Sequence, residues 1–454
     1  MERPARAAHT ERGLERLIIF TDAVIAIAAT LLILPIIDAI SDAFSDEGGL
    51  SNLATDRAPL QVMAFVVGFI AMTSAWRLHH GTFELVKDYS RGLVVWNFVW
   101  LFAMVFLALP AGFLYSGQGN GEIIALYWFS LGVIWAVLSS TRIYVLRRPE
   151  LLVDPDRTIQ TPYYAWVLLP LVSLFSLALA FLIIGVFEDG PIDFTVIWPV
   201  WLLFIPWVLL YRFPSRFRVP RRSPHTERGM DRLVFFSDAV VAIAITLLVL
   251  PLVDVITDDQ GDAQNLTQSI SEIGAKIIVF AFSFWLMSRQ WLINHRLFEN
   301  VKDYSQRLIT LIVMWLLFMV ILAIPSALMG HALVTQLGVR ENAYQELTDY
   351  FPEISLLFGT VMALISLTTA LTERYLRHHP ELLVDPTRLP SPRANYYVAI
   401  LYFALGALPF AFIWVDLNTI GLGLFLSVLL APFVSRLAER QDAAKRAANT
   451  QTQV

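Results

Sequence analysis

Cysteine is absent from this sequence of 454 residues. The chain therefore has no disulfide, no cysteine-ligated metal ion and no thiol nucleophile. Histidine is scarce as well. The eight histidines are scattered, and their spacing is not that of a zinc site or of a nucleophile with a neighbouring base. We therefore expect no enzyme activity, no metal ion and no cofactor.

Charged residues are also few. They make up 16% of the chain, whereas 57% of the residues are hydrophobic, and soluble domains are about a quarter charged and under half apolar. A water-soluble fold could not bury this much apolar surface, so lipid must cover part of it. The net charge of −5 gives no support for nucleic-acid binding. The first apolar run is too long for a signal peptide, so no cleaved leader is expected.

Long apolar runs dominate the chain. A membrane-spanning helix needs about 20 mostly apolar residues, and these runs are continuous rather than alternating, which excludes barrel strands. Six runs in the first half start near Leu17, Gln61, Leu93, Glu122, Tyr163 and Val196. Six in the second half start near Leu233, Ala275, Leu308, Ile354, Tyr396 and Thr419. The sequence thus predicts an all-α polytopic membrane protein with about twelve transmembrane helices.

Basic residues indicate which loops face the cytoplasm. The N-terminal segment, the segment TRIYVLRRPELLVDPDR and the mid-chain segment RFPSRFRVPRRSPHTER are basic, whereas the loops DAISDAFSDEGG and FEDGPID are acidic. Since basic loops stay in the cytoplasm, both termini and the mid-chain segment are expected there. The chain would be integral to a membrane, and we expect a prokaryotic cell membrane.

The two halves repeat each other. The segment HTERGLERLIIFTDAVIAIAATLLILPIIDAI returns as HTERGMDRLVFFSDAVVAIAITLLVLPLVDVI, with roughly two-thirds of the positions identical. The later blocks VKDYS and PELLVDP also return, and Pro110 and Pro325 close matching third spans. Each copy holds about six spans, an even number, so the copies are expected to be parallel repeats. We divide the chain into a first six-helix repeat (1–214), a cytoplasmic linker (215–224), a second six-helix repeat (225–437) and a polar cytoplasmic tail (438–454).

The first helix of each repeat has two distinct faces. On a wheel of about 100° per residue, one narrow stripe holds Ala23, Ile27, Thr30 and Leu34 in the first copy and Ala239, Ile243, Thr246 and Leu250 in the second. Such a stripe could line a path, but helix packing explains it equally simply, and a membrane threonine most often bonds to its own helix carbonyls. The aspartates Asp22 and Asp238 point away from the stripe, toward neighbouring helices.

An aspartate inside a membrane helix needs a partner. The second span of each repeat offers a tryptophan and a histidine four residues apart, hence on one face: Trp76 with His80, and Trp291 with His295. Arg16 and Arg232 are further candidates, from a different face of the first helix. We favour a structural clamp for this set over a proton relay. The VKDYS segments are interpreted as solvated turns.

These motifs resemble the transmembrane protein 175 family of potassium-permeable channels. The family pattern RxxxFSDAxxxIxxTxxxLP is met in the second copy by Arg232, Phe236, Ser237, Asp238, Ile243, Thr246, Leu250 and Pro251. The first copy has Arg16, Phe20 and Asp22 at the matching positions and departs once, with Thr21 in place of serine. Because threonine keeps the hydroxyl, we expect little change there.

The resemblance implies a two-repeat member that assembles as a homodimer, with four first helices around a pore. It implies no selectivity filter of the carbonyl-loop type, and no TVGYG-like segment occurs here. An apolar ring of Ile27 and Ile243 would gate the pore, with Thr30, Thr246, Leu34 and Leu250 further outward. Potassium ions would permeate, with protons as a further candidate, and the motif with the second-span Trp and His would hold the helix tilt.

Two other functions fit the span count. A secondary transporter with two parallel six-helix halves is the main alternative, although such carriers usually have charged or broken helices near the membrane centre, and the sequence offers no strong candidate for one. A membrane scaffold or sensor is less favoured, because no appended soluble domain is apparent. The tail from Ser435 reads as a frayed helix end.

Overall fold

A computed structural model describes the parts of the chain that position the candidate site. The described residues are 3–45, 58–115, 121–154, 227–250, 252, 265–336, 351–390, 392–411 and 434. They form two compact units: the first comprises Met1–Pro35 and Pro59–Phe236, and the second comprises Ile36–Ala58 and Ser237–Val454. The N-terminal part of α11 therefore belongs to the first unit, together with the helices of the first repeat other than α2, which from Ile36 on belongs to the second unit. The predicted linker 215–224 lies outside the described residues, so the proposed domain boundaries stay a prediction.

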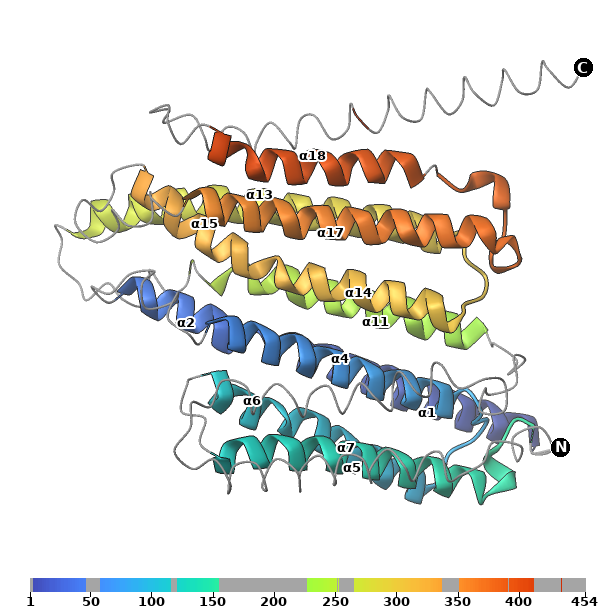
Figure 1. Cartoon of the computed structure of the whole chain (residues 1–454). Helices are drawn as coiled ribbons and strands as arrows, with labels where there is room; N and C mark the ends of the chain where they lie inside the picture. Colours follow the sequence, from blue (N-terminus) through green and yellow to red (C-terminus); the bar gives the residue numbers. More distant parts are fainter. Residues whose placement is uncertain are drawn as a thin grey trace, which may run out of the picture. The chain divides into compact units, whose positions relative to one another are not determined.

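Helices make up the regular structure of the described residues (Figure 1). Those of the first half are α1 (Arg3–Leu31), α2 (Leu34–Ser45), α4 (Ala58–Phe83), α5 (Arg91–Phe106), α6 (Ala108–Tyr115) and α7 (Gly121–Leu146). Those of the second half are α11 (Glu227–Leu247), α13 (Asn265–Phe298), α14 (Gln306–Ile321), α15 (Ala323–Gln336), α17 (Phe351–His378) and α18 (Pro392–Ala411).

Several helical stretches are long and apolar enough to cross a membrane. Within the described residues these are Arg12–Asp38, Arg91–Gly112, Phe129–Leu146, Lys276–Phe298, Gln306–Gly330 and Phe351–His378. The prediction of an all-α polytopic membrane protein is confirmed. The runs predicted near Tyr163, Val196 and Thr419 lie outside the described residues, so the total of about twelve spans stays a prediction.

Proline sets where four of these helices break. A proline has no N–H for the carbonyl four residues earlier, and its ring clashes with that carbonyl. Each helix accordingly ends four residues before a proline: at Leu31 before Pro35, at Phe106 before Pro110, at Leu247 before Pro251 and at Ile321 before Pro325. The third spans continue past their prolines as α6 and α15. The interpretation that Pro110 and Pro325 close these spans was therefore wrong, because one irregular residue is enough to restart the helix.

The VKDYS segments are tied down rather than freely solvated. In the first unit Val86 pairs with Leu152 of the PELLVDP segment, and in the second unit Val301 pairs with Leu383. Ser90 caps α5 by accepting the Leu93 N–H at 3.2 Å. Its hydroxyl also lies 2.9 Å from the hydroxyl of Tyr144 on α7. The second unit repeats this arrangement with Ser305, Leu308 and Tyr375.

The helices pack around the third span in the first unit and around α17 in the second. In the first unit α5 packs against α1 and α7, and in the second unit α14 packs against α17, which in turn lies along α18 (Figure 1). The buried cluster of Leu14, Ile18, Phe83, Leu93 and Val145 joins four of the first unit's helices near the VKDYS turn. This packing fixes α1 against the second and third spans, where the polar residues of the candidate site lie.

Candidate functional site

Asp22 is the centre of the candidate site in the first unit. Its side chain is fully buried on α1. The Trp76 indole N–H of α4 donates to Oδ1 at 2.9 Å. The Arg232 guanidinium of α11 donates from Nε to Oδ2 and from Nη2 to Oδ1, both at 2.9 Å. A buried carboxylate is stable only with this kind of paired, hydrogen-bonded partner. We call Asp22, Trp76 and Arg232 the first clamp.

Aromatic stacking reinforces the first clamp. Phe236 lies one turn beyond Arg232 on the same face of α11, and its ring stacks on Trp76 with centroids 3.9 Å apart and an interplanar angle of 14°. The His80 ring also packs against Trp76, with the two ring centroids 5.1 Å apart. The His80 backbone carbonyl accepts from Arg232 Nη1 at 3.2 Å. The predicted partner Trp76 is therefore confirmed as a contact. Arg232 binds the aspartate of the other repeat rather than Asp238 on its own helix.

A second polar chain starts next to the first clamp. Thr21 donates its hydroxyl to the Leu17 carbonyl at 2.7 Å and accepts the Asn97 amide N–H at 2.8 Å. The Asn97 carbonyl oxygen in turn lies 2.9 Å from His79 Nε2. The His79 ring is stacked on Trp100, with centroids 4.3 Å apart. Sequence reasoning missed Asn97 and His79. The signal was a single amide in the otherwise apolar third span.

The second unit holds the corresponding clamp in a more open form. The Trp291 indole donates to Asp238 Oδ1 at 2.7 Å, and the His295 ring stacks on Trp291 at 5.0 Å. Both Asp238 and Trp291 are only half-buried, whereas Asp22 and Trp76 are fully buried. We call Asp238 and Trp291 the second clamp.

The serine of the motif differs from its threonine counterpart. Ser237 is buried, and its hydroxyl has no hydrogen-bond partner among the described residues. Ile312 stands where the first repeat has Asn97, so the amide donor is missing. Thr21 and Ser237 therefore occupy equivalent positions but differ in their hydrogen bonds. The presence of a hydroxyl in both residues did not predict this difference.

The predicted pore stripe of α1 is partly exposed and partly buried. Ile27 is 45% exposed, and Phe20 and Leu31 lie on the same exposed stripe. Thr30 is fully buried, and its hydroxyl donates to the Ala26 and Ile27 carbonyls at 2.9 Å. Leu34, at the start of α2, is half-buried. Thr30 thus bonds to its own helix, as membrane threonines commonly do.

The stripe of α11 is arranged differently. Thr246 is exposed, and its hydroxyl donates to the Ile243 carbonyl at 2.7 Å. Ile243 and Leu250 are half-buried. The pore-lining role of these residues stays a prediction in both repeats. Arg16 of α1, the repeat counterpart of Arg232, is exposed.

Metal binding has no support in the part of the chain that the structure describes. No group of three or more histidine, aspartate or glutamate side chains lies close enough there to hold an ion. Asp22 instead accepts from an indole and a guanidinium, and Asp238 accepts from an indole.

Comparison with known proteins identifies the repeated unit. The family model described as endosomal/lysosomal potassium channel TMEM175 matches residues 16–108 and again residues 232–323. Two stretches of the chain, one in each repeat, thus match the TMEM175 family. The sequence-based assignment to the TMEM175 family is confirmed, and each matched region begins at the arginine of the motif, Arg16 or Arg232.

Curated TMEM175 proteins resemble the chain at low identity. The protein named endosomal/lysosomal proton channel TMEM175 from Homo sapiens is 23% identical over 316 residues, which cover 64% of this chain and 61% of that protein. The proteins of the same name from Danio rerio and Gallus gallus are 22% and 23% identical, again over 64% of this chain. The match thus spans about three-fifths of the length of these TMEM175 relatives.

Proposed function

We propose that this chain is a potassium-permeable cation channel whose pore is lined by the first helix of each repeat. The observation that carries the proposal is the duplicated TMEM175 domain, matched from Arg16 and from Arg232. The family is described as a potassium channel and its relatives are named proton channels, so protons are the second candidate ion. The cell membrane of a prokaryote, with both termini in the cytoplasm, is the proposed location.

The two faces of α1 support a pore-lining role. Trp76 and Arg232 hold Asp22 on one side of the helix. Ile27 and Leu31, four residues apart, form an exposed apolar stripe on another side. A ring of such side chains can close a path by excluding water. We assign the constriction to Ile27 and Ile243, with Thr30, Thr246, Leu34 and Leu250 further along the path.

The difference between the two clamps supports a homodimer. Within the first unit, Arg232 and Phe236 dock onto Asp22 and Trp76 and bury them. Their repeat counterparts Arg16 and Phe20 are exposed, and the second clamp is only half-buried. We propose that Arg16 of the partner subunit and Phe20 of the partner subunit dock onto Asp238 and Trp291. Two chains would then close a ring of four first helices, in which each clamp has its arginine.

A charge exchange tests this dimer. Arg16→Asp or Asp238→Arg alone places two like charges together and should convert the dimer to monomer in detergent, measured by light scattering on a sizing column. The double variant Arg16→Asp with Asp238→Arg should restore the dimer. The matched control is Asp22→Arg with Arg232→Asp, which exchanges charges within one chain and should leave the dimer present. A dimer unaffected by either single change would contradict the arrangement.

Potassium flux into liposomes tests the channel itself. Purified protein should pass potassium down its gradient without saturation. The variant Ile27→Asn with Ile243→Asn should raise the flux, because polar side chains wet the constriction. The variant Val95→Asn with Val99→Asn on the exposed face of α5 is the control and should leave it unchanged. An unchanged flux in the Ile27 and Ile243 variant would show that the gate lies elsewhere.

A secondary transporter is the second candidate, and one observation favours it. The first and third spans are broken at Pro35, Pro110 and Pro325, and broken helices are common where carriers bind substrate. The sequence analysis did not identify these breaks. Uptake that saturates with substrate and stops when the proton gradient is collapsed would favour the transporter over the channel.

A further inference from the structure

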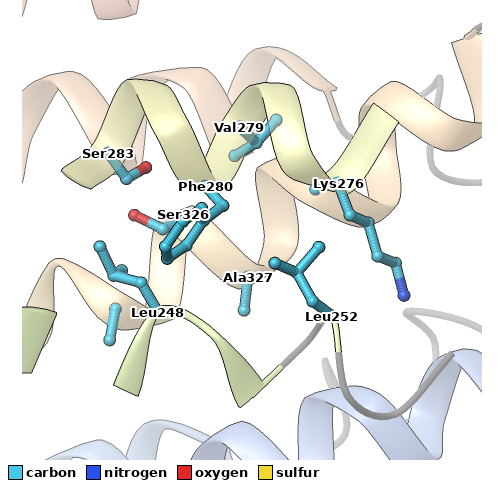
Figure 2. A pocket seen from close by; sticks show the side chains of 10 residues that line it. Leu248, Leu252, Lys276, Val279, Phe280, Ser283, Ser326 and Ala327 are labelled. Atoms are coloured by element: carbon cyan, nitrogen blue, oxygen red, sulfur yellow. The ribbon is translucent and has the colours of Figure 1, made fainter. Parts of the chain in front are cut away.

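A small cavity lies inside the second unit, away from both clamps. It is enclosed by the end of α11, by α13 and by α15, and is lined by Leu248, Leu252, Phe280, Ser283, Ser326 and Gly330 (Figure 2). The space open to the centre of a water molecule is about 20 Å³, and an ordered water needs roughly 10–15 Å³ on this measure. The cavity can therefore hold one water molecule and little more.

The cavity lies where two proline breaks meet. Leu248 and Leu252 flank the break of α11, and Ser326 lies in the first turn of α15, just past the break after α14. The prolines at 251 and 325 leave the carbonyls four residues earlier without an N–H donor from the same helix. In membrane helices such carbonyls are satisfied by neighbouring hydroxyls and by ordered water.

Ser283 supplies an unpartnered hydroxyl to this cavity. Its side chain is fully buried on α13, and its Oγ has no hydrogen-bond partner among the described residues. Figure 2 shows the hydroxyls of Ser283 and Ser326 at the same end of the cavity. Ser326 donates to the Leu322 carbonyl at 2.7 Å, so its oxygen still has a lone pair with which to accept. A water molecule between them would have both a donor and an acceptor.

We propose that this cavity is a water-binding site, with one ordered molecule held between Ser283 and Ser326 beside the break of α11. The first repeat has Gly68 and Ala111 at the matching positions, so it lacks both hydroxyls. A side chain on Gly68 would also find little room, since its Cβ would lie 3.1 Å from Leu32 Cδ1. The two serines of the proposed site therefore have no counterpart in the first repeat. The site stands whether or not the chain conducts ions.

Radiolytic footprinting in ¹⁸O-labelled water tests this site directly. Bound water generates hydroxyl radicals that label adjacent side chains, so Phe280 should gain ¹⁸O. Its counterpart in the first repeat, Phe65, is fully buried, whereas Phe280 is half-buried, so Phe65 is the negative control. Ser283→Val removes the hydroxyl and fills the space, and labelling of Phe280 should fall below that in the parent chain.

Ala327→Val fills the same cavity from α15 and should have the same effect, which covers the case in which the Ser283 variant does not fold. Both variants keep the outer face of Phe280, so any labelling from solvent outside the cavity is unchanged. Labelling of Phe280 that is equal in the parent chain and in a folded filled variant would overturn the proposal. Potassium flux of the same variants reports separately on the channel.

Discussion

At the scale of single residues, Asp22 shows how a buried charge is paired in this chain. Asp22 has three donors, from the Trp76 indole and two nitrogens of Arg232. A buried carboxylate without such partners is strongly unfavourable in a membrane protein. The aspartate is therefore a fixed structural point of α1. Its partners, an indole N–H and a guanidinium, donate hydrogen bonds and accept none.

Removing the indole donor should measure this dependence. Trp76→Phe keeps an aromatic ring against Phe236 but loses the N–H, and hydrogen bonds to charged groups contribute about 1.5–3 kcal/mol. We expect the free energy of unfolding to fall by that amount. Thermal or denaturant unfolding in detergent measures it. Trp291→Phe in the half-buried second clamp is the control. It should lower the free energy of unfolding of the monomer by less. Equal losses at the two positions would contradict the difference in burial.

The two motif hydroxyls should also respond differently to deletion. Thr21→Val leaves the buried Asn97 amide without its acceptor, which costs about 1–3 kcal/mol. Ser237→Ala removes a hydroxyl that has no partner among the described residues, so unfolding should be unchanged or slightly harder. The two variants are compared by the same unfolding measurement. A destabilised Ser237→Ala would mean that this hydroxyl has an important partner.

At the scale of helices, proline and glycine decide how the elements bend and approach. The four proline breaks follow one local rule, so they were predictable from sequence once helices were assigned. The contact between α17 and α18 was less predictable. Gly359 and Gly406 face each other there, and a Cβ on Gly359 would lie 2.6 Å from Gly406 Cα and from the Tyr402 carbonyl oxygen. Sequence alone shows the glycines but not which of them meet.

A single methyl group should therefore disturb the α17–α18 contact. Gly359→Ala forces the two helices apart, and overpacking of this kind costs about 1–3 kcal/mol. Gly274→Ala on α13 is the matched control, because its Cβ would meet nothing within 4 Å. That change should stabilise the protein by up to about 1 kcal/mol through helix propensity. The close contact would be disproved if both alanines had the same effect on unfolding in detergent.

Much of the element-level structure followed from the sequence, and the exceptions have a common cause. Apolar runs predicted the described helices, since their length depends only on local composition. The pairing of Arg232 with Asp22 was not predicted, because the two residues lie in different repeats and only tertiary packing brings them together. The same is true of Asn97 and His79. The contacts of the VKDYS turns were not predicted, because their partner, the PELLVDP segment, is distant in sequence.

At the scale of the whole molecule, the two TMEM175 domains are similar in sequence but not equivalent in structure. The first clamp is closed by Arg232 and Phe236, whereas the second clamp is half-open and the matching Arg16 and Phe20 are exposed. The homodimer proposed above rests on this difference between the two repeats.

The central claim is that the first helices line the ion path, and the absence of cysteine makes a direct measurement possible. Ile27→Cys is introduced into the otherwise cysteine-free channel, and potassium current is recorded in a planar bilayer while a cationic methanethiosulfonate reagent is added to the water. The parent channel and Val99→Cys, exposed on α5, are the controls. The proposal predicts that the reagent blocks Ile27→Cys and leaves both controls unchanged. The proposal would be contradicted if the labelled Ile27→Cys channel carried the same potassium current as the controls.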